Sequence, residues 1–265
     1  MKRVLGGVVV AAALSGSAFA ADLPPRTYGK APAMAAPATN WSGLYIGGNV
    51  GYGWGNGSTG ILPLSVDESD VFPTSTLDSQ LKGVFGGAQI GYNWQIGSIV
   101  TGLEADIQSS GIRGSARAAL VNLGGAGPGD ITASTSSELS WFGTVRGRLG
   151  VTVTPDLLLY GTGGLAYGRV KASANVQIDD PPFLDSWPAS ISSTKTGWAA
   201  GAGAEWMFAR NWSAKVEYLH IDLGSSSATA IDIVAPGEGP LATTTTYSWK
   251  HHYDTLSVGV NYHFN

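Results

Sequence analysis

Beyond residue 40 the chain consists of segments in which apolar and polar residues alternate with a period of two, and this pattern constrains the fold more than any other feature. A period of two is typical of β-strands, because successive side chains of a strand point to opposite faces. The sequence therefore predicts an all-β chain of eight strands, at 41–54, 80–94, 99–112, 137–152, 157–171, 195–208, 212–223 and 250–264.

The connections between these segments alternate in length. Those at 95–98, 153–156 and 209–211 have three or four residues, whereas those at 55–79, 113–136, 172–194 and 224–249 have 23 to 26. Barrels of bacterial outer membranes have an even number of strands, short periplasmic turns and long extracellular loops. We therefore expect an eight-stranded antiparallel up-and-down transmembrane β-barrel with short periplasmic turns and long extracellular loops.

The polar faces of the predicted strands carry charged side chains that would point into the barrel. Eight strands leave an interior just wide enough for side chains, which excludes a wide porin. An unpaired buried charge is costly, so we expect these groups to form a salt-bridge network that fills the lumen. A narrow, charge-lined conducting path is the alternative. The faces of 157–171 stay unassigned, and the predicted network comprises Glu104, Asp106, Arg146, Arg148, Glu205, Lys215 and Glu217.

Aromatic residues gather near both ends of the predicted strands. Amphipathic rings settle at the headgroup level of a bilayer, and transmembrane barrels carry an aromatic girdle at each interface. A soluble β-sandwich, the alternative fold, explains neither two girdles nor the asymmetry of the connections. The predicted girdles comprise Trp41, Trp54, Trp94, Trp141, Trp198, Trp206, Trp212, Trp249, Tyr262 and Phe264.

The first forty residues have a different character. Residues 1–20 combine a positive start, an apolar stretch and an Ala18-Phe19-Ala20 cleavage motif, so we expect a cleaved signal peptide and export. Residues 21–40 are rich in proline and alanine, which predicts an extended periplasmic linker before a barrel at 41–265. The chain has no cysteine, which excludes disulfides and thiolate sites, and its net charge of -4 argues against a nucleic-acid partner.

Several segments resemble the alphaproteobacterial outer-membrane β-barrel proteins, an OmpA-like superfamily that includes major surface antigens and hemin-binding proteins. The resemblance covers roughly Trp41 to Asn265 and implies the barrel fold, the outer membrane as location, and hemin as a candidate ligand. It says much less about activity. The segments that carry it are Trp41 to Tyr52, Gly86 to Trp94, Leu159 to Tyr167, Glu217 to Leu219, and Gly259 to Phe264.

The four long connections are acidic. They hold ten Asp and Glu residues against Arg113 and Arg117, a net charge of -8 from ten minus two. Such loops would repel anionic partners and attract cations. Their spacing matches no calcium loop, so we expect solvated acidic loops and no metal site.

A histidine pair at the start of the last predicted strand is the one candidate ligand site. His251 and His252 precede Tyr253. Imidazole suits iron, and the family that the chain resembles includes hemin binders, so the two histidines are candidate ligands for hemin, which Tyr253 could assist. A hydrolase acting on lipid would need a histidine beside a carboxylate and a nucleophile. No recognisable catalytic motif accompanies the pair. We therefore expect no enzyme, no catalytic residues and no cofactor.

Taken together, the sequence predicts a structural outer-membrane barrel that contributes to envelope integrity and displays acidic surface loops. The alternatives are a small-solute or ion-conducting channel, a surface receptor for hemin or a host ligand, and, with the least support, an outer-membrane lipid hydrolase. We expect a monomer in contact with outer-membrane lipid and lipopolysaccharide, inserted by the barrel-assembly machinery through its C-terminal strand.

Overall fold

A computed structural model of the chain describes residues 39–61, 65–67, 70–71, 75–120, 130–180, 183–231 and 244–264. The predicted signal peptide and nearly all of the predicted linker lie outside these residues. Among the described residues, no helix is long and apolar enough to span a membrane. The strands are β1 (Gly43–Ile61), β2 (Ser65–Asp67), β3 (Asp70–Val71), β4 (Ser75–Ile96), β5 (Ile99–Leu120), β6 (Asp130–Thr154), β7 (Leu157–Asp180), β8 (Phe183–Ala209), β9 (Trp212–Ile231) and β10 (Thr244–His263).

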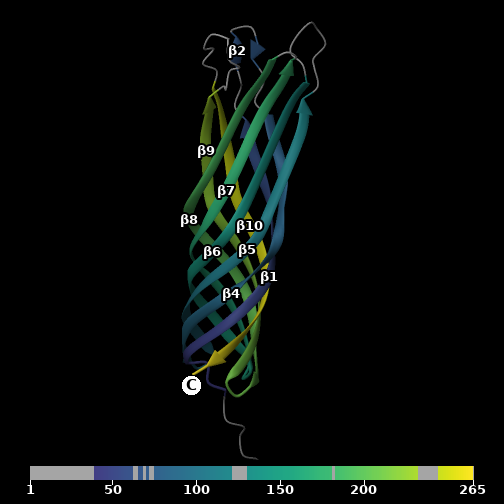
Figure 1. Cartoon of the computed structure of the whole chain (residues 1–265). Helices are drawn as coiled ribbons and strands as arrows, with labels where there is room; N and C mark the ends of the chain where they lie inside the picture. Colours follow the sequence, from purple (N-terminus) through teal and green to yellow (C-terminus); the bar gives the residue numbers. More distant parts are fainter. Residues whose placement is uncertain are drawn as a thin grey trace, which may run out of the picture. The chain divides into compact units, whose positions relative to one another are not determined.

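Eight of these strands close into an antiparallel barrel in the order β1, β10, β9, β8, β7, β6, β5, β4, with β1 hydrogen-bonded to both β10 and β4 (Figure 1). β2 and β3 form a separate two-stranded sheet. Consecutive barrel strands are joined at the end that carries the C-terminus by two-residue turns, and in the first of these Gly97 adopts a φ of 61° that favours glycine. The predicted all-β, eight-stranded, up-and-down barrel is confirmed.

The strands run much further than the sequence predicts. Large parts of the segments expected to be long loops at 55–79, 113–136, 172–194 and 224–249 are paired strand, and the β7–β8 ladder continues to the pair Asp180 and Phe183. In these extensions serine and threonine occur on both faces: many point outward, whereas others, such as Thr135 and Ser137, point inward together with alanines and a few aromatic residues. Their weak hydrophobic contrast looks like a loop in the sequence, although the backbone hydrogen bonds continue.

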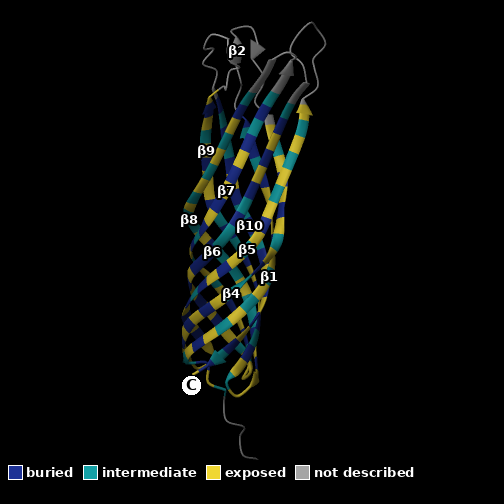
Figure 2. Ribbon diagram, in the orientation of Figure 1, coloured by how far each residue is buried: buried dark blue, intermediate teal, exposed yellow. Residues whose placement is uncertain are grey.

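The outer face of the barrel carries an apolar band bounded by aromatic rings. Exposed and buried positions alternate along the strands of this part (Figure 2). A contiguous exposed apolar belt fits lipid and not water, and the closed ladder leaves no unpaired edge in it. Six of the predicted girdle residues are 40 to 56% exposed, Trp141 and Tyr262 are half-buried, and the six are Trp54, Trp94, Trp198, Trp206, Trp212 and Phe264.

For two residues the prediction of a girdle position is wrong. Trp41 is 0% and Trp249 2% exposed, and both lie inside the barrel. Trp41 is an even number of residues from Tyr45, which faces the lumen, and therefore lies on the same face. Trp249 lies on the same face of β10 as the buried Thr255. The strand period therefore points both indoles inward. Proximity to a strand end was an insufficient criterion for a girdle position.

The lumen is filled in layers. Near the periplasmic turns a small apolar cluster surrounds Trp41, and the charged residues follow above it. A second apolar cluster around Phe85, Phe142 and Tyr253 lies at the level of the outer girdle, and a third, around Trp187, fills the extension. In the strand whose faces the sequence left open, Leu158, Tyr160, Ala166 and Val170 point inward, while Leu159 and Leu165 point to lipid.

Candidate functional site

All seven charged residues predicted for the lumen lie together in it. Their side chains come from β5, β6, β8 and β9 and are nearly inaccessible to solvent. Glu104 and Arg146 are direct cross-strand partners, whereas Arg148 and Lys215 reach carboxylates on strands that are not their neighbours. The network therefore cross-braces the barrel through its interior.

Arg146 is the centre of one half of the network. Its Nη2 atom lies 2.7 Å from a carboxylate oxygen of Glu104 on β5 and 3.0 Å from one of Glu217 on β9. Asp106 is a third partner at 3.1 Å. Lys215 donates to both oxygens of Glu104, at 3.0 and 3.2 Å. Three carboxylates thus share two cations in the middle of the lumen.

Glu205 is the centre of the other half. Arg148 donates to it at 2.7 Å, and Ser213 and Asn261 donate to its second oxygen at 2.6 and 2.7 Å. The ring of His263 lies 3.3 Å from the same oxygen. The seven predicted residues comprise four acids and three bases, and His263 adds an imidazole beside Glu205.

Two tyrosines complete the network, and the sequence analysis missed both. Tyr45 donates to Glu104 at 2.7 Å and accepts from Arg148 at 2.9 Å, and Tyr160 donates to Glu217 at 2.9 Å. The Arg148 guanidinium stacks 4.0 Å above the centre of the Tyr160 ring, a cation–π contact. Each ring lies over the glycine directly across the ladder, Gly91 for Tyr45 and Gly203 for Tyr160. An inward aromatic residue opposite a glycine is the signal that would have identified them.

The periplasmic mouth below the network is covered by Trp41. Its indole nitrogen donates to the carbonyl of Pro155 in the β6–β7 turn at 3.1 Å. Its backbone nitrogen donates to the side chain of Gln95 at 2.8 Å, and its ring packs edge-on against His263. The residues that precede β1 therefore tie the start of the barrel to the end of β4 and to the β6–β7 turn, and close its mouth.

The predicted ligand group His251, His252 and Tyr253 is not assembled. Because neighbouring residues of a strand face opposite sides, His251 and Tyr253 are buried inside the barrel and His252 points outward. His251 shares a hydrogen bond of 3.0 Å with Ser226. The two imidazoles cannot face one ligand from the same side.

Two histidine–aspartate pairs lie instead on the outer face of β9 and β10, at the level of the outer girdle. His220 is 2.8 Å from Asp254, and His252 is 3.5 Å from Asp222. Tyr218 also donates to Asp254, at 2.6 Å. Within the described part of the chain, no group of three or more acidic or histidine ligands has the geometry of a metal site. These pairs link two strands at the lipid interface.

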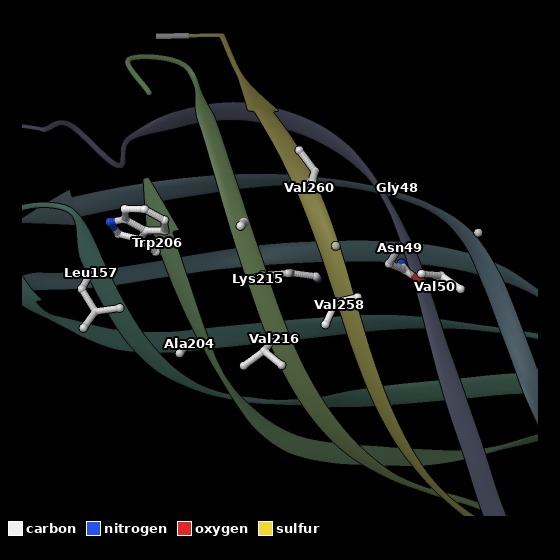
Figure 3. Close-up of a pocket in the computed structure, with 13 residues that line it drawn as sticks. Gly48, Asn49, Val50, Leu157, Ala204, Trp206, Lys215, Val216, Val258 and Val260 are labelled. Atoms are coloured by element: carbon white, nitrogen blue, oxygen red, sulfur yellow. The ribbon is translucent and has the colours of Figure 1, made fainter. Parts of the chain in front are cut away.

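A shallow groove of about 810 Å³ lies on the outer wall across β8, β9, β10 and β1 (Figure 3). Small residues deepen it, among them Gly48, Ala204 and Ala214, and valines and Trp206 border it. The Lys215 ammonium turns away from the groove to Glu104 in the lumen. The groove therefore presents an apolar surface inside the lipid-facing band.

Comparison with known proteins gives a consistent picture. The family model described as "Outer membrane protein beta-barrel domain" matches residues 7–264. A 31 kDa outer-membrane immunogenic protein of Brucella melitensis biotype 1 is 36% identical over 256 residues, which cover 96% of this chain and 97% of that protein. A 22 kDa outer membrane protein of Rhizobium leguminosarum bv. viciae is 32% identical and covers 71% of this chain and 67% of its own.

Solved structures of similar shape share little sequence with the chain. The outer membrane protein OprG of Pseudomonas aeruginosa is 11% identical, with a TM-score of 0.44, and the match covers 85% of this chain and 99% of OprG. The outer membrane protease OmpT of Escherichia coli is also 11% identical, with a TM-score of 0.43 over 83% of this chain and 97% of OmpT. Neither likeness bears on activity.

Proposed function

The chain belongs to the outer-membrane β-barrel protein family, and from this premise we propose that it is a structural, non-conducting barrel that supports the envelope and carries an extension to the cell surface. The observation that carries the proposal is the filled lumen. A barrel of eight strands has room only for side chains, and here apolar and ion-paired layers occupy that room along the length of the barrel.

The channel alternative has the weaker support. A conducting path needs continuous polar lining that ions can enter and leave. Here the Trp41 cluster lies below the charged layer, and the cluster around Phe85 and Phe142 lies above it. A solute would have to displace buried aromatic side chains on both sides of the network.

Among the residues that the structure describes, no assembled site supports binding of hemin or hydrolysis of lipid. Hemin ligation through the predicted histidines would need them on one face, and they are on two. A hydrolase would need a nucleophile and an oxyanion hole beside the outward His220–Asp254 pair. Within the described residues, Asp254 of β10 forms its hydrogen bonds with His220 and Tyr218 of β9, and these bonds link the two strands.

The structural role can be tested in a strain from which the gene has been deleted. We expect the deletion to increase sensitivity to detergents and to large antibiotics, and the parent chain to reverse that increase. The double change Glu104→Gln with Glu217→Gln retains the barrel surface but weakens the internal bracing, so it should restore the barrier only in part. An unchanged barrier in the deletion strain would contradict the structural role.

A further inference from the structure

The outer surface of the extracellular part of the barrel is positively charged on one side and weakly negatively charged on the other. Of the outward side chains that the structure describes at and beyond the outer girdle, β4 to β7 carry five basic and two acidic ones, a net charge of +3. The outward described side chains of β8, β9, β10 and β1 carry one basic and two acidic groups there, a net of -1 with neutral histidines. The basic residues on the first side are Lys82, Arg113, Arg117, Arg169 and Lys171.

These basic residues are close neighbours across the ladder. Lys82 is directly opposite Arg113, and Arg169 is opposite Trp141 of the girdle. Lys171 lies 3.4 Å from Glu138, and Arg113 is opposite the same carboxylate across the β5–β6 ladder, whereas Arg117 forms no ion pair with another residue whose side chain the structure describes. Glu138 therefore offsets only part of the positive charge, and the net positive charge of this wall is available to a partner outside the protein.

A row of hydroxyl groups runs between the basic residues. Ser115, Ser136, Ser173 and Ser190 are in register across β5, β6, β7 and β8, and all four are exposed. The row lines a shallow groove of about 750 Å³, together with Arg117 and Asn175. The groove has no aromatic side chain in its lining. Hydroxyl, amide and guanidinium groups in this arrangement suit the hydroxyls and anionic groups of a saccharide.

The height of this wall above the outer girdle indicates which partner it can contact. Seven residues of β6 separate Trp141 from Ser134, about 23 Å of strand and, at a tilt near 45°, about 16 Å above the outer girdle. That interval is where the phosphates and the anionic inner sugars of the outer leaflet's lipopolysaccharide stand. We propose that the outer face of β5, β6 and β7 beyond the girdle, with Arg113, Arg117 and Lys171 as anion ligands and the serine row beneath the sugars, docks the phosphorylated core saccharide of lipopolysaccharide.

Calorimetric titration of the refolded full chain in phosphatidylcholine nanodiscs tests the proposal. The probe is deacylated, phosphorylated core oligosaccharide from lipopolysaccharide, which has no acyl chains to bind the bilayer. The variant Arg113→Ser with Lys171→Ser should bind it about tenfold more weakly, as the loss of two charge-assisted contacts predicts. The matched control, Arg210→Ser with Lys250→Ser, removes two exposed charges away from this wall and should bind within about twofold of the parent.

Two further arms identify the ligand chemistry. Removal of the phosphates from the oligosaccharide should weaken binding to the parent and leave the Arg113→Ser, Lys171→Ser variant little changed. Ser173→Glu, which places a negative charge in the middle of the row, should weaken binding with the barrel still folded, as a heat-dependent shift in gel mobility reports. Equal binding by both double variants would overturn the proposal. So would tighter binding of a heparin fragment than of the core oligosaccharide, because the wall would then fit a sulfated glycan from outside the cell.

Discussion

Among single residues, Arg146 is the one whose substitution we expect to lower the stability of the barrel most. It is buried and holds carboxylates from two other strands, β5 and β9. Removing one partner of a buried ion pair leaves uncompensated charge, which costs far more than the pair contributes in net stability. The network is therefore better understood as a device that fixes the positions of strands than as a source of stability.

We predict that Arg146→Met lowers the free energy of unfolding by about 3 to 5 kcal/mol, because three carboxylates would then share the remaining cations. Urea unfolding in phospholipid vesicles, followed by tryptophan fluorescence, measures the change. Arg113→Met, exposed on the outer wall, is the control and should stay within about 0.5 kcal/mol of the parent. Equal unfolding midpoints for the two variants would show that Arg146 does not brace the barrel.

Gly91→Ala tests the packing of Tyr45 at the same scale. A Cβ atom at position 91 would lie 2.3 Å from the Tyr45 hydroxyl oxygen, which must then leave Glu104 and Arg148. The expected loss is about 1 to 3 kcal/mol, typical of overpacking in a dense interior. At Gly147 the nearest atom would be 3.9 Å away, so Gly147→Ala should be tolerated in the same unfolding assay. A tolerated alanine at position 91 would show that the ring has room to move.

Among the structural elements, the segment before β1 acts as a cover for the periplasmic mouth. The chain has no cysteine, so Met207→Cys places a single thiol in the cluster around Trp41. We predict slow reaction of this thiol with a membrane-impermeant maleimide, and a rate about tenfold higher when Trp41→Ala opens the mouth. Trp94→Ala, on the lipid face, should leave the rate slow. Rapid labelling with Trp41 in place would contradict a closed mouth.

The strand extensions make a separate prediction. Residues 132–136 and 172–177, expected from the sequence to be loop, are paired in the β6–β7 ladder. Their amide hydrogens should exchange with deuterium orders of magnitude more slowly than those of an open loop. Mass spectrometry of peptides from these segments gives the rates. Complete exchange within seconds would show that the extensions are not stable strands.

The membrane part of each strand could be predicted from the sequence because lipid outside and charge inside give a strong contrast at alternate positions. The extensions could not, since there serine and threonine occur on both the outer and the lumen face, which leaves little contrast between alternate positions. Two irregularities also change the phase of the pattern: β6 has one extra residue at Ser140, and β9 has a bulge near Gly224, whose φ is 74°. Which acid meets which base depends on register across the lumen, as for Arg148 and Glu205, and that register is not encoded in the period of either strand.

As a whole molecule, the barrel is filled inside and chemically divided outside. Its lumen charges are ion-paired between apolar layers, and the wall beyond the membrane has a basic side on β4 to β7. Passage of solutes would therefore depend on the lumen, and docking at the surface on the outer wall. Substitutions in the lumen should leave docking unchanged, and substitutions on the outer wall should leave conductance unchanged.

Single-channel conductance of the refolded chain in planar bilayers tests the closed lumen most directly. We predict no steady openings for the parent, in preparations whose heat-dependent gel mobility shows a folded barrel. The double variant Arg146→Ala with Arg148→Ala should show at most brief, irregular currents, because the apolar layers remain. Steady openings of the parent, altered in size by this double change, would contradict the account and establish a narrow pore controlled by its lumen charges.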